Sequence, residues 1–470
     1  MPQRMLQFVT IGGRMPKKRP VEVRREDFVE IYGDYIDARA REQASRCSQC
    51  GVPFCQSHCP LHNNIPDWLM LTAEGRVEDA YRVSAATNNM PEICGRICPQ
   101  DRLCEGACVI EQSGHGTVTI GSIERYLTDT AWEKGWVEPV SPHRELPLSV
   151  GIIGAGPAGL AAAEQLRLQG WQVTVYDRHD RAGGLLIYGI PNFKLDKSIV
   201  ARRTKRLEDG GIEFVLNCDV GTDISFAKLQ RKHQAVLIAT GVYKARDLAC
   251  PGAGEPHVRA ALPFLIENNR RDLGDKIQAD TAEGRDVVVI GGGDTAMDCV
   301  RTAVRQGANS VTCLYRRDAA NMPGSKRETR NAREEGVGFE WLAGPKAIHN
   351  DKVRAERMHL GARDKSGRQN PEVLKGSDFD VRADLVIKAL GFTPEAMDTL
   401  SPDLMLTRRD TVKVNPLTFE TNISGVYAAG DIVRGASLVV WAIREGRDAA
   451  THMHGYLRDL MAANMKAAAA

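Results

Sequence analysis

The sequence lacks the features by which membrane, secreted and nucleic-acid-binding proteins are usually recognised. Aromatic residues are scarce, at 6% of the 470 residues, and the formal net charge is only +2, so no strong field of one sign would attract nucleic acid. No apolar run approaches the roughly eighteen residues of a membrane span, and the basic N-terminal stretch is not followed by the apolar core of a secretion signal. We therefore expect a cytoplasmic protein with neither nucleic acid nor a membrane as its partner.

Cysteine, by contrast, is abundant, with twelve residues. A disulfide framework is not expected, because the cytoplasm keeps thiols reduced. Eight of the twelve lie between Cys47 and Cys108, which makes them candidate metal ligands. The four scattered thiols are expected to lie in the core: Cys218, Cys250, Cys299 and Cys313.

The clustered cysteines form two runs. The first consists of Cys47, Cys50, Cys55 and Cys59, and the second of Cys94, Cys98, Cys104 and Cys108. Eight thiolates can hold two four-iron clusters, and in two-cluster ferredoxins the last cysteine of a run, before a proline, binds the other cluster. Proline follows both Cys59 and Cys98. Two zinc sites, each held by four thiolates, are the alternative.

The region around these runs carries no repeated strand-helix-strand pattern. Segments 67–84 and 120–132 predict helices between cysteine-bearing loops. Segment 137–147, with three prolines, then interrupts the periodicity and predicts a linker. Residues 1–145 are therefore expected to form a small helical domain that binds metal.

A strand, a glycine-rich turn, a helix and a second strand are predicted over residues 148–176. The turn consists of Gly154, Ala155, Gly156, Pro157, Ala158 and Gly159. Such a turn, close to a helix N-terminus, binds the pyrophosphate of a dinucleotide. Asp177 ends the second strand, where an acid can accept a hydrogen bond from a ribose hydroxyl.

The same pattern returns over residues 286–315, with the turn and helix start at Gly291, Gly293, Asp294, Thr295 and Ala296. Its second strand ends in Arg316 and Arg317 instead of an acid. Two guanidinium groups suit the 2′-phosphate of NADPH, and Lys326 and Arg327 could add to that pocket. The alternative is that the arginines are solvated at a strand end.

Two further segments complete the predicted site. Residues 426–429 predict a short buried strand, which places Asp431 at a carboxyl end, where α/β folds bind ligands. A helix is expected to begin near Ser437, and its positive end would face the ligand bound at this edge. Segment 183–191 contains no cysteine, so the redox-active cysteine pair of the disulfide reductases is absent there.

These motifs resemble the small (β) subunit family of bacterial NADPH-dependent glutamate synthases over essentially the whole chain. The related modules include the electron-input half of dihydropyrimidine dehydrogenase. The resemblance rests on the cysteine runs, both glycine turns and the segments 183–191, 314–317, 389–392 and 429–431. It implies FAD at the first turn, with Gly430 and Asp431 reaching its ribityl and phosphate part, and NADPH at the second. Further expected cofactor contacts are Arg178, Gly184, Leu185, Gly241 and Ser437.

The resemblance also implies two 4Fe-4S clusters. Some relatives use an oxygen ligand in place of one cysteine, and Glu124 occupies the matching position here. Cys94 would then be the free thiol, but the sequence leaves open which of the two is a ligand.

The expected fold class is α/β: two Rossmann-like dinucleotide-binding domains preceded by the helical iron–sulfur domain. Its predicted boundaries are 1–145 for the iron–sulfur domain, 146–255 with 395–460 for the FAD domain, and 256–394 for an inserted NADPH domain.

The expected function is transfer of hydride from NADPH to FAD, followed by passage of single electrons through the clusters. Hydride transfer itself is expected to need no side-chain acid or base. By resemblance the acceptor is FMN on a large α subunit, which makes two glutamates from glutamine and 2-oxoglutarate and docks on the N-terminal domain. The alternatives are a stand-alone NADPH:ferredoxin or polysulfide reductase, and an interaction module held together by zinc on a flavoprotein scaffold.

Overall fold

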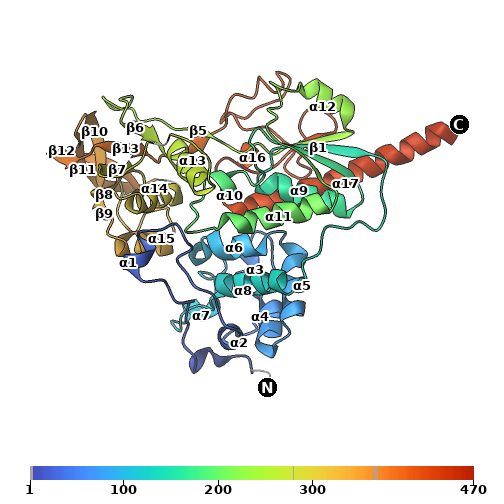
Figure 1. Ribbon diagram of the computed structural model, residues 1–470, viewed down its shortest axis with the longest axis horizontal. Coiled ribbons are helices and arrows are strands. Elements are labelled where there is room, and N and C mark those ends of the chain that lie inside the picture. The colour runs from blue at the N-terminus through green and yellow to red at the C-terminus, as the bar shows by residue number, and fades with distance from the viewer. Residues whose placement is uncertain (1–3, 279, 365–366, 368, 470) are drawn as a thin grey trace.

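The computed structural model describes residues 4–278, 280–364, 367 and 369–469. Three regions meet at the centre of the molecule: a helical N-terminal region and two regions that each contain a parallel sheet (Figure 1). The fold class is therefore the predicted one. No helix in these described ranges is both long and apolar enough to cross a membrane.

The N-terminal region is helical, as predicted. It contains η1 (Gln7–Val9), α1 (Val21–Arg24), α2 (Asp37–Ala44), α3 (Phe54–Ser57), α4 (Ile65–Glu74), α5 (Val77–Thr87), α6 (Pro91–Ile97), η2 (Gln100–Arg102), α7 (Val109–Gln112) and α8 (Ile120–Glu133). Trp68, Leu69, Ile123 and Leu127 form part of its buried core. The prediction of a single helix over 67–84 was wrong, because Gly75 adopts a left-handed conformation and ends α4 before α5 begins.

The first sheet is fully parallel and has the order β15-β4-β1-β2-β3. Its strands are β1 (Ser149–Ile153), β2 (Gln172–Tyr176), β3 (Glu213–Val215), β4 (Ala235–Ile238) and β15 (Val426–Ala428). The accompanying helices are α9 (Pro157–Leu168), α10 (Leu185–Tyr188), α11 (Lys197–Asp209), α12 (Phe226–Lys232), α16 (Asp431–Arg434) and α17 (Val439–Ala469). Because β15 follows the second region in the sequence, the chain leaves the first sheet after β4 and returns to complete it.

The second parallel sheet has the order β6-β13-β7-β8-β9. Its strands are β6 (Val258–Ala260), β7 (Asp286–Ile290), β8 (Ser310–Tyr315), β9 (Gly338–Trp341) and β13 (Leu385–Lys388), with helices α13 (Ala261–Asp272), α14 (Asp294–Arg305) and α15 (Lys326–Glu334). Two short strands, β5 (Lys244–Ala245) and β14 (Phe392–Thr393), pair with each other in the segments that connect the two sheets.

A third, antiparallel sheet was not predicted. It consists of β10 (Ala343–His349), β11 (Lys352–Arg363) and β12 (Gln369–Arg382), in that order. In Figure 1 it lies at the far edge of the second sheet, away from the first sheet.

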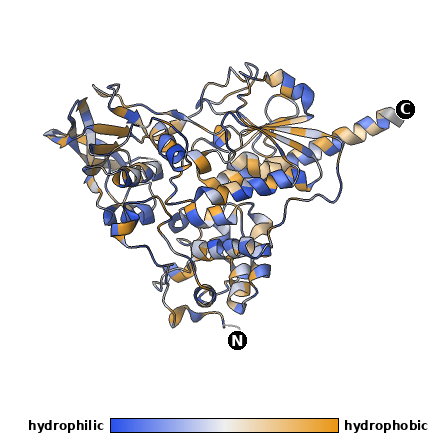
Figure 2. Cartoon of the chain, viewed as in Figure 1, coloured by the Kyte–Doolittle hydropathy of each residue, from blue (hydrophilic) through white to orange (hydrophobic). Residues whose placement is uncertain are grey.

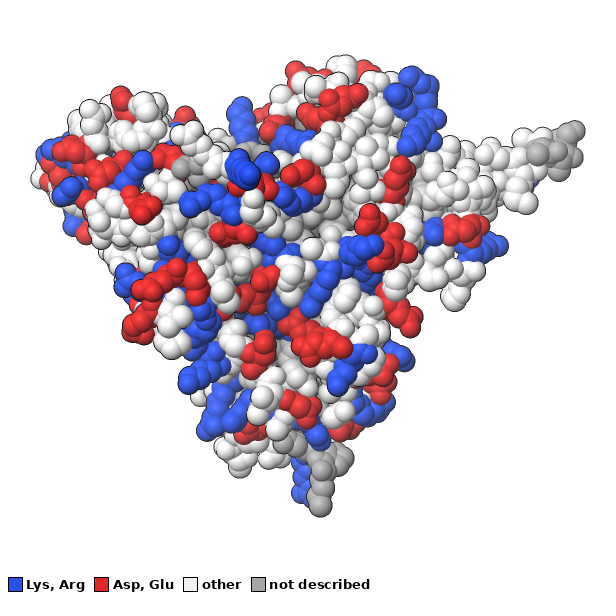
Figure 3. All heavy atoms as spheres, viewed as in Figure 1, with Lys and Arg blue, Asp and Glu red and all other residues white. Residues whose placement is uncertain are grey.

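The strands of the parallel sheets form the core, and the surface is mixed. Apolar residues fill both central strands, β1 and β7, where Ile152 and Val288 have no exposed surface (Figure 2). Figure 3 shows basic and acidic side chains interspersed over the face in view, in line with the small net charge. The first and second sheets are thus buried on both faces, as parallel sheets require.

Candidate functional site

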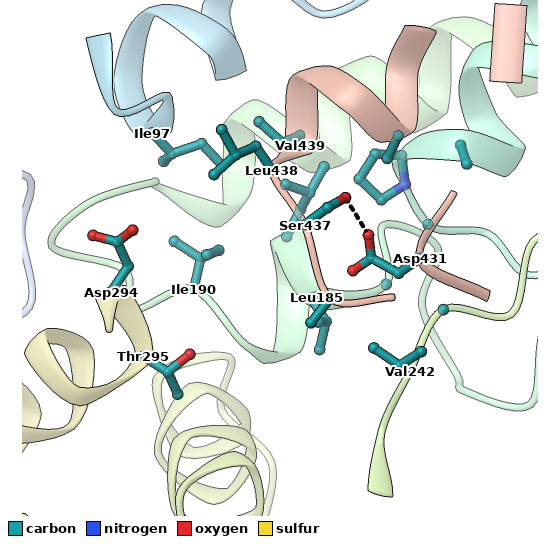
Figure 4. A pocket seen from close by; sticks show the side chains of 18 of the residues that line it. Ile97, Leu185, Ile190, Val242, Asp294, Thr295, Asp431, Ser437, Leu438 and Val439 are labelled. Atoms are coloured by element: carbon teal, nitrogen blue, oxygen red, sulfur yellow. Dashed lines mark hydrogen bonds between the residues drawn. The ribbon is translucent and has the colours of Figure 1, made fainter. Parts of the chain in front are cut away.

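A cavity of about 280 Å³ lies where the three regions meet. The first glycine turn contributes Gly154, Gly156, Pro157 and Ala158 to its lining, together with Asp177, Gly184, Leu185, Gly241, Asp431 and Ser437. The second turn contributes Asp294 and Thr295, and the N-terminal region contributes Cys98 and Pro99. Figure 4 shows Asp294 and Thr295 on one side of this cavity and Asp431 and Ser437 on the other. Residues predicted to bind FAD, NADPH and an iron–sulfur cluster therefore line the same cavity.

The first turn can be built only with glycine at two positions. A Cβ on Gly154, whose φ is +108°, would lie 2.4 Å from the carbonyl oxygen of Ala239. A Cβ on Gly159 would lie 2.0 Å from the carbonyl oxygen of Gly154, which explains the close packing of α9 on the turn. Gly156 differs, because nothing lies within 4 Å of its Cβ position. The open space there fits the close approach of a pyrophosphate.

Asp177 is buried beside this turn and holds the backbone. Its carboxylate accepts hydrogen bonds from the amides of Ala155, at 2.7 Å, and His179, at 2.8 Å. Each carboxylate oxygen keeps further acceptor capacity for a ribose hydroxyl. Arg178 pairs with Glu395 at 2.8 Å and lies over the ring of Tyr243.

A second cavity of about 210 Å³ shares Gly154, Asp177, Gly241 and Thr240 with the first. Within the described ranges, Thr240 Oγ1 and His179 Nε2 are buried without a hydrogen-bond partner. Buried polar atoms of this kind call for a ligand or water. Two adjoining cavities with unpaired polar atoms fit an extended dinucleotide such as FAD.

The C-terminal contribution depends on Gly430. Its φ is +80°, and a Cβ there would lie 2.8 Å from the Cβ of Ala158. The bend brings Asp431 to the cavity, where its carboxylate accepts a hydrogen bond from Ser437 Oγ at 2.6 Å (Figure 4). Burial raises the pKa of Asp431. Ser437, Leu438 and Val439 line the same cavity at the N-terminus of α17, which begins at Val439, close to the predicted start at Ser437.

The second turn repeats the geometry of the first. A Cβ on Gly291, at φ +146°, would lie 2.2 Å from the carbonyl oxygen of Ala389, whereas Gly293 faces open space. Asp294 accepts a hydrogen bond from the amide of Ser325 at 2.8 Å. Ala296 is buried where α14 packs on the sheet. This turn therefore also has room for a phosphate group at a helix N-terminus.

The two arginines predicted to select NADPH differ in environment. Arg316 is exposed, while Arg317 is 6% exposed and donates from Nε to the carbonyl of Gln369 in β12 at 3.1 Å. Arg327 lines the large cavity and pairs with Glu105 of the N-terminal region at 3.0 Å. Arg317 thus has a structural contact in addition to any role at the nucleotide.

One feature of the cavity escaped the sequence analysis. Lys194 and Asp298 line it and form an ion pair at 2.7 Å between the first and second sheet regions. Both side chains are nearly buried. The only signal in the sequence was the position of Lys194 just after the segment 183–191.

The clustered cysteines separate into two groups. Cys47, Cys50, Cys55 and Cys108 line one small cavity of about 20 Å³. Cys59, Cys94, Cys98 and Cys104 form the second group, close enough for their charges to interact. Each group contains cysteines from both runs, and Cys59, which precedes a proline, belongs to the second group. Two-cluster ferredoxins share cysteines between their clusters in the same way, so this arrangement fits two iron–sulfur clusters.

Burial governs the ionisation of these thiols. It raises the pKa of Cys47 and Cys59 to about 11 and that of Cys55 to about 12. A bound cation reverses this, because a coordinating thiol is deprotonated. In the part of the chain that the structure describes, no three thiol, carboxylate or imidazole side chains converge on a point where a single metal ion would sit.

Glu124 and Cys94 both lie beside the second group. Asn88 Nδ2 donates to Glu124 at 3.1 Å, and the Cys94 thiol contacts Asn88 Oδ1 at 3.8 Å. Burial raises the pKa of Glu124 to about 8. The two candidate ligands are therefore neighbours, joined through one amide.

The scattered cysteines only partly follow the prediction. Cys299 and Cys313 are core residues, but the prediction was wrong for Cys218 and Cys250, which are half-buried. Cys218 lines the second cavity.

Comparison with known proteins matches the N-terminal region and the remainder of the chain to two different families. The family described as "Dihydroprymidine dehydrogenase domain II, 4Fe-4S cluster" matches residues 24–136, and "Pyridine nucleotide-disulphide oxidoreductase" matches residues 148–446. The fold of FprA from Mycobacterium tuberculosis, solved in complex with NADPH, is similar with a TM-score of 0.58 at 21% identity, over 68% of this chain and 86% of that one.

Two curated relatives are similar over nearly their whole length. The glutamate synthase [NADPH] small chain of Azospirillum brasilense is 63% identical, covering 97% of both chains. The Escherichia coli protein of the same name is 45% identical, covering 97% of this chain and all of its own. This chain is therefore an oxidoreductase that belongs to the family of glutamate synthase [NADPH] small chains.

Proposed function

We propose that the chain is the electron-input subunit of a glutamate synthase. When bound, FAD would accept hydride from NADPH, and two 4Fe-4S clusters would carry single electrons to FMN on the large subunit, which converts L-glutamine and 2-oxoglutarate to two L-glutamate. The observation that carries this proposal is the single cavity lined by both glycine turns and by Cys98.

The residues of the chain bind and orient the nucleotides. The amides at the starts of α9 and α14 would hold the two pyrophosphates, and Asp177 and Asp431 would accept from FAD hydroxyls. Apolar side chains of Leu185, Ile190 and Leu438 line the space between and keep water out (Figure 4). No described side chain needs to act as acid or base for hydride transfer.

We assign the cluster ligands from the two cysteine groups. Cys47, Cys50, Cys55 and Cys108 would hold one cluster, and Cys59, Cys98 and Cys104 the other, completed by Cys94 or Glu124. Because Cys98 lines the large cavity, the second group is the entry point for electrons. The first group would then be the exit.

The proposed domains are those expected from the sequence: 1–145, 146–255 with 395–460, and 256–394. Support comes from β15, which joins the first sheet, and from β5 and β14, which pair in the connecting segments.

The large subunit is the proposed partner, and the surface around the first cysteine group is the proposed docking surface. Leu6, Val9, Val52 and Phe54 are exposed there, and the amide of Leu6 bonds to the carbonyl of Cys47. Exposed apolar side chains beside a redox centre fit a partner that must come close to it. A complex of this kind would work in the cytoplasm, where thiols stay reduced.

The test is to purify the chain anaerobically with and without a large subunit. We expect NADPH to bleach the flavin of the chain alone, and glutamate to form only with both subunits. Rapid reduction of ferredoxin or polysulfide without any partner would favour the stand-alone reductase, and zinc without iron or acid-labile sulfide would favour the interaction module.

A further inference from the structure

Segment 183–191 forms one wall of the large cavity. Leu185, Leu186 and Ile190 line it, and Figure 4 shows Leu185 and Ile190 between Thr295 on one side and Asp431 on the other. The only regular element in the segment is α10, which is four residues long. The last carbonyls of so short a helix have no partner within it, so other groups must bond to them.

Two buried side chains from other helices supply those bonds. Lys197, the first residue of α11, donates from Nζ to the carbonyls of Leu186, at 3.0 Å, and Ile190. Asn269 of α13 donates from Nδ2 to Tyr188, at 2.8 Å, and again to Ile190, at 3.1 Å. Three carbonyls of the wall, those of Leu186, Tyr188 and Ile190, thereby accept side-chain hydrogen bonds, and the carbonyl of Ile190 accepts two.

A lysine is a costly choice for this position, because a buried amine loses its hydration. Lys197 is only 6% exposed, and among the described residues no carboxylate lies within 4 Å of its Nζ. An apolar side chain of similar length would fill the space without that cost. What only the amine provides is donation to two backbone carbonyls of the wall.

We propose that Lys197 is a positioning residue for hydride transfer: by fixing Leu186 and Ile190 it holds the apolar wall against which the two reacting rings must align. The proposal rests on the function proposed above. Misplacement of reacting groups by about 1 Å can lower a rate roughly a hundredfold, so a wall held from behind has catalytic value.

The charge of the amine is compatible with this role. Burial lowers the pKa of Lys197 to about 7, while Asp272 of α13, Asp298 of α14 and the neighbouring Asp196 oppose that shift and Lys194 adds to it. A neutral amine still carries two hydrogens, enough for both carbonyls.

Lys197 can also be reached from outside. It lines a surface groove of about 520 Å³ that shares no lining residue with the large cavity, together with Ala201, Phe214 and Lys205. A small amine could enter there if the lysine side chain were removed. Lys205 lies on the same helix and groove but is largely exposed and pairs with Asp209, so it provides a matched control.

The test uses the full chain loaded with FAD. We expect Lys197→Met to keep its FAD but to slow flavin reduction by NADPH at least about tenfold, with KM for NADPH nearly unchanged and the flavin absorption band shifted. Lys205→Met should match the wild type in all three. Wild-type rate and spectrum in Lys197→Met would overturn the proposal.

Chemical rescue separates positioning from folding. In Lys197→Ala, added propylamine should restore much of the reduction rate, whereas the same concentration of propanol should not. Loss of FAD or of the fold that propylamine does not repair would make Lys197 a structural residue only and sink the proposal. If the wild type itself is not bleached by NADPH, the proposed function fails instead.

Discussion

Arg316 and Arg317 are adjacent in sequence, but they lie in different environments, so their predicted effects can be measured separately. Arg316 is exposed, so Arg316→Gln should raise KM for NADPH by one to two decades without loss of stability, since a charge-assisted phosphate bond contributes about 1.5–3 kcal/mol. Arg317→Gln should also lower the free energy of unfolding by about 1–3 kcal/mol, because its bond to Gln369 is lost. Steady-state kinetics with both nucleotides and denaturant unfolding would check this; equal losses with NADPH and NADH in Arg316→Gln would contradict it.

His233 should give the protein an acid-sensitive site. It is buried between Ser149 Oγ, 3.0 Å from Nδ1, and the hydroxyl of Tyr176, 2.9 Å from Nε2. Burial lowers the pKa of His233 to about 4, so between pH 6.5 and 4 the unfolded chain binds a proton that the folded chain does not. The free energy of unfolding should therefore fall as the pH drops through that window, by at most about 3 kcal/mol from this group.

The measurement is unfolding at several pH values. His233→Gln, which cannot titrate, should show a shallower loss between pH 6.5 and 4 than the wild type. His349→Gln, at an exposed position, serves as the control and should follow the wild-type curve. Parallel curves for all three proteins would show that His233 is not the titrating group.

The roles of residues within a known sequence motif could be predicted, whereas the roles of residues that other helices bring to the site could not. Gly154, Gly291 and Asp177 could be predicted because the dinucleotide-binding turn allows few other residue types at these positions. Lys197 and Asn269 act on backbone carbonyls, and a backbone carbonyl has no sequence signature. Their roles emerge only when three helices have packed.

At the scale of elements, the repeated strand-turn-helix units were predicted to within a residue or two. The second unit begins with β7 at Asp286 and ends with β8 at Tyr315, as predicted, because apolar strands beside a glycine turn have few other solutions. The sheet of β10 to β12 was missed because its strands carry charged residues on an exposed face and little continuous apolar pattern. These strands are stabilised by pairing with neighbouring strands, as where Val353 of β11 lies opposite Val381 of β12.

Helices α1, α14 and α15 share a buried charge network centred on Glu335. Its carboxylate accepts from Arg301 at 2.9 Å and Arg305 at 2.7 Å, and pairs with Arg24 at 3.2 Å. Burial by itself would raise the pKa of Glu335, but the arginines hold it at about 2. The network joins the N-terminal segment to the second sheet region.

Removing the charge of Glu335 should be costly. Glu335→Gln leaves the buried Arg305 without a carboxylate, while Arg24 and Arg301 each keep one other partner, Glu334 and Glu328. Breaking a buried ion pair in this way typically costs about 3–5 kcal/mol. Glu334→Gln removes a partly exposed carboxylate while Arg24 keeps Glu335, so it should cost about 1 kcal/mol or less. Denaturant unfolding of both variants checks the difference, and equal small losses would mean that water reaches the network.

On the scale of the whole molecule, the sequence indicated which modules are present but not how they meet. Each cysteine run is one continuous stretch of sequence, yet each group of cysteines in the fold contains members of both runs. That exchange requires α6 and the loop after it to lie against the first run, which no local pattern specifies. Cys98 reaches the large cavity for the same reason, and this contact supports the direction of the proposed electron path.

The proposed separation of electron entry from electron exit yields the last prediction. Cys50→Ser removes a proposed ligand from the group remote from the cavity, so iron content should fall while FAD stays bound. NADPH-driven reduction of a dye that accepts directly from flavin should largely survive, because Gly154, Asp431 and Thr295 are untouched, whereas glutamate formation with the large subunit should vanish. Cys250→Ser, at a half-buried cysteine outside both groups, should keep both activities. If dye reduction and FAD content collapse together in Cys50→Ser, the cluster is a structural support for the flavin region; if glutamate formation persists, Cys50 does not lie on the electron path.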